Sequence, residues 1–251
     1  MKTYKDILEN INNGISDLYF IHYSCQSLSD DNEGYSPRIT SIAVLHSESY
    51  QMFSFSIHLV AERLKINRDL IFDRYEEIEL KMLQDFFDFV SERIDKAIWV
   101  HWNMSNINFG FEALEHRYTV LSGNPCNHIS ENNKHNLSNI IKLKYGPKYA
   151  KDPKMKYLMV LNNILHRDFL NGEEEVTAFK AKEFIKLHKS TMCKVYFFNE
   201  VYNRIMSNKL KTETNRLRYK INEIYQSPIV QIITMVGTIG TIISLIVFFF
   251  I

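Results

Sequence analysis

Histidine, serine, asparagine and cysteine side chains lie in or beside three otherwise apolar segments of the 251-residue chain. These candidate cleft residues are His22, Ser24, His101, Asn103, His188 and Cys193. Two or three imidazoles near a thiol could bind a soft metal ion or a phosphate group. Histidines satisfied by backbone carbonyls in a partly buried cleft explain the same pattern without any ligand. The residue types alone therefore assign no catalytic residue, resident metal or cofactor.

The elements that must position these residues follow from periodicity. β-Branched and aromatic runs predict strands, the first three of which form an antiparallel meander. The expected strands are 18–25, 38–46, 51–59 and 97–102. Apolar residues at helical intervals predict helices elsewhere. The expected helices are 74–93, 109–121, 135–145, 155–165 and much of 173–207.

This order of elements, with three short strings, resembles the DEDD-type 3′–5′ exonuclease branch of the ribonuclease H-like fold. The strings are residues 20–24 (FIHYS), 101–109 (HWNMSNINF) and 188–193 (HKSTMC). The resemblance spans about residues 18–205 and implies an α/β fold, with a mixed sheet and flanking helices. In that fold the first and fourth strands are neighbours. We therefore expect His22, His101 and Asn103 to face one cleft, with His188 opposite.

The acids of that family are missing from all three strings. The family's chemistry requires carboxylates that hold two divalent metal ions about 4 Å apart. No Asp or Glu lies between Asp17 and Asp30, between Asp95 and Glu112, or between Glu183 and Glu200. The residues at or near the expected acid positions are His22, Ser24, Asn106 or Asn108, and Cys193.

Neutral or soft groups bind Mg²⁺ poorly, so we expect a catalytically degenerate, nuclease-like domain. The alternative is an active metal-dependent nuclease with unusual ligands. Those ligands would be His22, His101, Glu112 and His188.

Residues 229–251 contain no charged residue and 16 apolar ones. A bilayer core of about 30 Å requires about 20 helical residues, so this segment is long enough to span it. Ser227 and Pro228 suit the start of a helix. We expect a single-pass, tail-anchored transmembrane helix over 228–251, and the alternative is a helix buried in a larger fold.

Small and polar residues recur along one face of that expected helix. They are Gln231, Thr234, Gly237, Thr238, Gly240, Thr241 and Ser244. Such a face closes helix–helix contacts in hydrocarbon, so we expect a homo-oligomer. The alternatives are a narrow polar pathway through the membrane and hydroxyls that bond back to their own helix.

Basic residues outnumber acidic ones between 204 and 226, which predicts that this flank is cytoplasmic and attracted to anionic lipid. The basic residues nearest the span are Lys209, Lys211, Arg216, Arg218 and Lys220. Apolar residues at 210, 217, 221 and 224 predict an amphipathic linker helix over 209–227, after a domain over 1–208. A short coiled-coil seam and a helix packed on its own domain both fit this spacing.

Six lysines alternate with three tyrosines before the last predicted helices. They are Lys142, Lys144, Lys148, Lys151, Lys154 and Lys156, with Tyr145, Tyr149 and Tyr157. This segment could contact nucleic acid, a nucleotide or the membrane face, and a solvated loop explains it equally well. The formal net charge of +1 does not support a general nucleic-acid binder.

The three cysteines are widely spaced and the N-terminus has no apolar signal run, which indicates a reducing compartment. We expect a cytoplasmic N-terminal domain on a prokaryotic inner membrane. The architecture is similar to those met in antiviral defence operons. That similarity implies an effector or scaffold that oligomerises, perturbs the membrane and has a protein partner from a neighbouring gene. A passive membrane tether for that partner is the remaining alternative.

Overall fold

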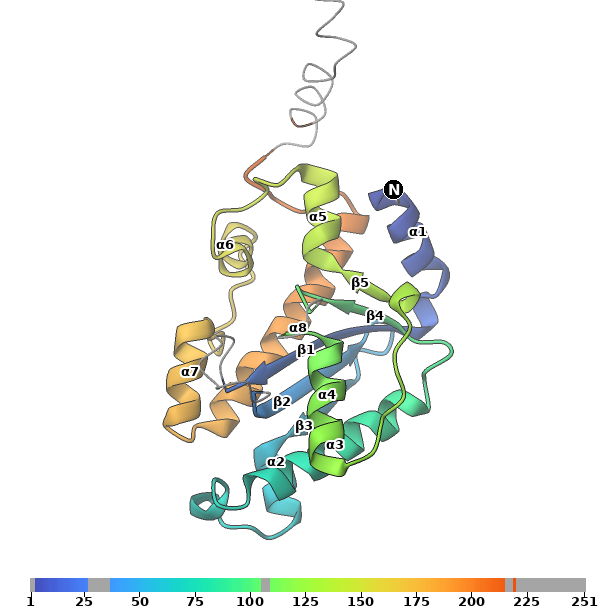
Figure 1. Cartoon of the computed structure of the whole chain (residues 1–251). Coiled ribbons are helices and arrows are strands. Elements are labelled where there is room, and N and C mark those ends of the chain that lie inside the picture. Colours follow the sequence, from blue (N-terminus) through green and yellow to red (C-terminus); the bar gives the residue numbers. More distant parts are fainter. Residues whose placement is uncertain (1–2, 27–36, 105–108, 215–218, 220–251) are drawn as a thin grey trace, which may run out of the picture.

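A five-stranded mixed sheet lies at the centre of the computed structural model, which describes residues 3–26, 37–104, 109–214 and 219 (Figure 1). Its strands are β1 (Leu18–Cys25), β2 (Ile39–His46), β3 (Met52–Ser56), β4 (Ile98–His101) and β5 (Lys134–Asn136). The order across the sheet is β3-β2-β1-β4-β5. Strand β2 runs antiparallel to β1 and β3, whereas β4 is parallel to β1 and β5. The expected α/β fold with a mixed sheet is confirmed.

Helices cover both faces of this sheet (Figure 1). They are α1 (Tyr4–Asn13), α2 (Ile57–Arg63), α3 (Tyr75–Ser91), α4 (Phe111–Ser122), α5 (Leu137–Tyr145), α6 (Lys154–Leu161), α7 (Gly172–Lys180) and α8 (Phe184–Met206). Helices α3 and α4 pack on one face. The long helix α8 crosses the other face against β1 and β2, with α1 and α5 beside it.

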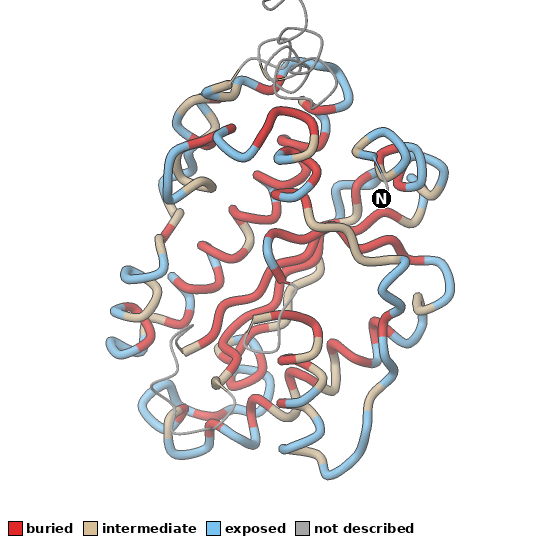
Figure 2. Tube along the Cα trace, turned by 45° about the horizontal axis from the view of Figure 1, so that its top comes forward, coloured by how far each residue is buried: buried red, intermediate tan, exposed pale blue. Residues whose placement is uncertain are grey.

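Side-chain alternation along β1 divides the interior into two cores. Tyr19, Ile21 and Tyr23 point into the core under α3 and α4. Leu18 and Phe20 point into the core under α8. Successive side chains of a strand point to opposite faces, so a strand covered on both sides is buried throughout. All eight residues of β1 are buried, and Figure 2 shows the central strands as a continuous buried band.

Several sequence-based boundaries differ from the structure, and two of them have a clear physical reason. The strand expected to reach residue 59 ends at Ser56, because Ile57, Val60 and Ala61 bury one face of helix α2 instead. The helix expected over 135–145 begins only at Leu137. Residues 134–136 form β5, which pairs with β4, and Asn136 caps the following helix by accepting from the Ser138 N–H.

The linker helix expected from residue 209 does not begin there, because residues 209–214 are not helical. This segment belongs to the head: Leu210 is buried in the core under α8, and the Lys211 N–H donates to Asn162 Oδ1 at 2.9 Å. Residues 209–211 therefore pack against the head. Core burial of Leu210 outweighs the apolar spacing that suggested a helix.

Within the described ranges, no helix combines the length and apolar character needed to cross a membrane. The expected span at 228–251, its polar face and the basic residues Arg216, Arg218 and Lys220 lie outside those ranges.

Candidate functional site

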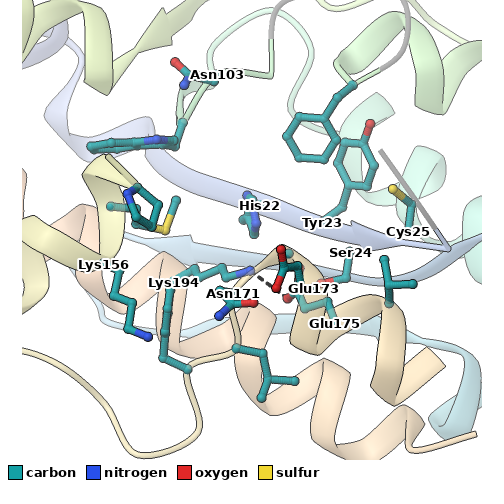
Figure 3. A pocket seen from close by; sticks show the side chains of 18 residues that line it. His22, Tyr23, Ser24, Cys25, Asn103, Lys156, Asn171, Glu173, Glu175 and Lys194 are labelled. Atoms are coloured by element: carbon teal, nitrogen blue, oxygen red, sulfur yellow. Dashed lines mark hydrogen bonds and ion pairs between the residues drawn. The ribbon is translucent and has the colours of Figure 1, made fainter. Parts of the chain in front are cut away.

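A cleft of about 530 Å³ opens where β1 ends, between the sheet, α7 and the middle of α8 (Figure 3). Trp102, Phe109 and Phe169 supply aromatic wall. His22 and Ser24 enter from β1, because they alternate with Ile21 and Tyr23 and so face α8. The first string of the sequence resemblance therefore lines a real cavity.

A buried ion pair forms the polar floor of this cleft. Lys194 Nζ of α8 lies 2.6 Å from Glu175 Oε1 of α7, and the exposed fractions of the two side chains are only 7% and 13%. Figure 3 shows Lys194 reaching across to Glu175 beside His22. A charge-assisted hydrogen bond of this length is strong, and each charge here depends on the other for solvation.

Hydroxyl groups also donate hydrogen bonds to the Glu175 carboxylate. Ser190 Oγ donates to Glu175 Oε1 at 2.9 Å, and Ser24 Oγ donates to the same oxygen at 3.1 Å. Thr191 Oγ1 lies 2.7 Å from Ser24 Oγ and donates to the Leu187 carbonyl at 3.0 Å. One carboxylate thus joins β1, α7 and α8 through a lysine and two hydroxyls.

Burial keeps His22 neutral. The pKa of His22 is well below its ordinary value, first because the ring is desolvated and then because the Lys194 ammonium and His101 lie near it. Its Nδ1 is enclosed and has no hydrogen-bond partner in the described part of the chain. The ring packs edge-on against Phe109 and Phe198, with centroids 5.8 and 5.6 Å away.

Cys193 lies beside the cleft and does not line it. Burial raises the pKa of its thiol to about 12, so the sulfur stays protonated at neutral pH. Its Sγ donates to the Ser190 carbonyl at 3.1 Å. Cys193 therefore serves as a packed thiol at this position, and it is poorly suited to be a nucleophile or a metal ligand.

These residues do not fit the pair of divalent metal ions that the resemblance implies. Such a pair requires several carboxylates with free oxygen atoms. Glu175 already neutralises Lys194, and Glu173 is the only other carboxylate lining the cleft as described. Across the described residues, no group of three or more His, Cys, Asp or Glu side chains is placed to hold a metal ion. An ammonium group occupies the interior where cations would have to bind.

His101 and His22 do not share a cleft, contrary to the sequence-based expectation. His101 pairs with Ile21 in the sheet, so its side chain points to the α4 face, away from α8. Its Nδ1 accepts from the Met104 N–H at 3.0 Å, and it lines a separate cavity of about 240 Å³ with Glu112. Residues that pair across adjacent strands point to the same face of the sheet, and the partner of His101 is Ile21. His22, the next residue of β1, points to the opposite face, so the expectation was wrong.

His188 is also separate from the cleft. It faces β2, where its Nδ1 lies 2.6 Å from Ser41 Oγ, and its ring lies 5.2 Å from that of His58. The four proposed metal ligands His22, His101, Glu112 and His188 are thus distributed over three places. Asn103 does line the cleft, but its amide also bonds to Asn136, which ties β4 to β5.

Glu175 and Lys194 are the site residues that sequence reasoning missed. The capping box of α7, in which Asn171 and Glu174 cap each other's backbone N–H groups, is readable from the sequence. It fixes where the helix starts, but not which of three consecutive glutamates turns inward. The Glu175 carboxylate of α7 therefore enters the cleft, although the three sequence strings of the resemblance contain no acid.

No family model, no curated protein and no solved structure matches this chain. The cleft geometry and the sequence pattern therefore carry the functional argument.

Proposed function

We propose that this protein is a membrane-anchored effector or scaffold whose ribonuclease H-like head does not hydrolyse nucleic acid. The order β3-β2-β1-β4-β5, with β2 alone antiparallel to the other strands, supports the ribonuclease H-like assignment. The uncharged sequence of 229–251 supports the anchor. Its Gln, Thr, Ser and Gly face supports assembly of several copies in the membrane.

The main observation in favour of a head without hydrolytic activity is the ion pair between Glu175 and Lys194, next to Ser24. A two-metal nuclease needs uncompensated carboxylates at this position, whereas here the one inward carboxylate is neutralised by an ammonium group. The floor of the cleft is a hydrogen-bonded ion pair and the wall is aromatic, which suits packing or recognition. Activity is then expected at the membrane, and antiviral defence is the setting we propose from the resemblance of the architecture.

Regulated expression in a bacterial host tests this function. The full chain should stay in the membrane pellet after alkaline carbonate extraction, and its induction should arrest growth with loss of membrane potential. A chain truncated after residue 228 should be extractable and harmless. Lys194→Arg, which keeps the charge in the cleft, is the matched control and should behave like the full chain.

Two outcomes would contradict the proposal. Growth arrest by the truncated chain would place the activity in the head. A full chain that stays in the membrane, forms a stable complex with a neighbouring gene's product and causes no arrest would indicate a passive tether.

A further inference from the structure

The segment 209–214 and the loop after α5 form one face of the head. The Glu213 N–H donates to the Tyr149 carbonyl at 2.8 Å, and Thr214 Oγ1 donates to the Tyr145 carbonyl at 2.6 Å. The Tyr219 ring lies directly against Gly146. Residues 209–214 and Tyr219 therefore lie beside the α5–α6 loop, at the end of the molecule opposite α2 (Figure 1).

Five exposed lysines surround this exit, and we call them the exit face: Lys142, Lys148, Lys151, Lys209 and Lys211. Among the described residues, only Lys151 of these has a carboxylate within ion-pair distance, Glu213 at 3.8 Å. Glu213 also accepts from the Tyr157 hydroxyl, and Asp152 is paired with Lys154. The acids among the described residues therefore leave most of the positive charge of the exit face unbalanced.

We infer that the exit face docks on anionic lipid headgroups. This inference rests on the proposed function, because it requires residues 229–251 to enter a bilayer. Nine residues lie between Tyr219 and Ile229, which makes ten steps of at most about 3.5 Å along the chain, so Tyr219 can lie no more than about 35 Å from the start of the anchor. This tether is short enough to let the exit face reach the membrane surface. Lysines that come within a Debye length of a negatively charged leaflet, about 8 Å at physiological salt, are attracted to it, and added salt weakens the attraction.

Burial distinguishes the lysines that can bind lipid from a lysine of the same segment that only stabilises the fold. Lys144, from the same lysine-rich segment, is buried and donates to the Ile205 carbonyl and to Asn208 Oδ1, so it fixes α5 to the end of α8. The five exit-face lysines are exposed, and all but Lys151 have no ion-pair partner among the described residues. A flat, charged bilayer surface fits lysines spread over a loop, a helix end and an extended segment better than a shaped pocket does.

Hydrogen exchange on the full chain in lipid nanodiscs tests the inference. Amides of residues 146–152 should exchange at least about fivefold more slowly in discs containing phosphatidylserine than in phosphatidylcholine discs, because one docked lysine already corresponds to about that factor. The difference should vanish in about 0.5 M NaCl, where screening acts over only a few ångströms. It should also vanish in the triple variant Lys142→Glu, Lys148→Glu, Lys211→Glu.

The matched control is Lys65→Glu, Lys180→Glu, Lys189→Glu, which changes net charge equally at exposed positions near α2, α7 and the start of α8. It should keep the lipid-dependent protection. Equal loss of protection in both variants would overturn the inference, since it would reflect net charge alone. Protection by added RNA or DNA in place of anionic lipid, abolished by the exit-face variant, would also overturn it.

Carbonate extraction of each variant separates failure of the anchor from failure of the exit face. If the chain is extracted, the anchor is wrong, and flotation of the same chain with phosphatidylserine vesicles at low salt then tests the face. Flotation that the exit-face variant reduces and the control variant does not would support lipid docking. Equal flotation of the two variants would refute it.

Discussion

The buried position of Lys194 predicts a measurable contribution to the free energy of unfolding. It is buried with Glu175, and removing one partner of a buried ion pair costs about 3 kcal/mol, because it leaves a buried charge without compensation. We expect Lys194→Met to lower the free energy of unfolding of the full chain in detergent by about this amount. Urea denaturation measures it.

The double variant Lys194→Met, Glu175→Gln should recover most of that loss, because it removes both charges together. Lys186→Met is the matched control: its pair with Glu183 is half exposed, and exposed pairs contribute about 0–1 kcal/mol. A cost for Lys194→Met no larger than that of Lys186→Met would show that the cleft pair is solvated and open to metal ions.

His188 predicts a pH dependence of stability. Its pKa is lowered from the ordinary value of 6.5 to about 4, first by burial and then by the neighbouring His58. The unfolded chain therefore binds this proton first as pH falls, so stability is complete above about pH 6.5 and is lost between there and pH 4. His188→Gln should reduce the slope of unfolding free energy against pH by up to about 1.4 kcal/mol per pH unit in that window.

Unfolding curves collected at intervals from pH 5 to 7.5 give both slopes. His22 and His101 act in the same direction, since burial also lowers their pKa values, that of His101 to about 3. The variant should therefore keep a reduced slope. Identical slopes in the two proteins would mean that His188 is solvated in the folded state.

At the scale of elements, Gly146 joins the end of α5 to the exit of the chain. Its φ is +91°, a conformation that favours glycine, and an added Cβ would overlap the Tyr219 ring. Gly146→Ala should therefore destabilise the full chain by about 1–3 kcal/mol, and thermal unfolding detects it.

Gly172→Ala provides the comparison within the same chain. Gly172 begins α7, and an added Cβ there meets nothing within 4 Å, so this substitution should be neutral or slightly stabilising. If Gly146→Ala were equally harmless, residues 145–149 and Tyr219 would not be packed together, and the exit face would lose its geometric basis.

The sequence predicts the apolar strands β1 and β2, but it does not predict the polar strand β5. Strands β1 and β2 lie within one residue of their expected bounds, because continuous β-branched and aromatic runs reflect burial on both faces. Strand β5 consists of Lys134, His135 and Asn136, which have no apolar pattern, and only its pairing with β4 makes it a strand. The capping box of Thr3 and Asp6 is a readable signal for α1 that periodicity alone did not supply.

At the scale of the whole molecule, the sequence located the cleft but did not determine its contents. His22 and Ser24 were placed there because they follow the apolar start of β1. The inward carboxylate and ammonium came from α7 and α8, whose rotation about their axes is set by packing between segments far apart in the chain. The absence of acids from the three strings was readable directly, whereas the neutralisation of Glu175 required three-dimensional contacts.

Cleavage of end-labelled DNA and RNA, single-stranded and duplex, by excess full chain in nanodiscs tests the central claim most directly. The claim is that the Glu175–Lys194 pair leaves the cleft without metal-dependent hydrolysis. With Mg²⁺ or Mn²⁺ we expect no product above that of empty nanodiscs. Metal-dependent cleavage that is lost in His22→Ala, with the fold retained, would contradict the claim and establish a nuclease.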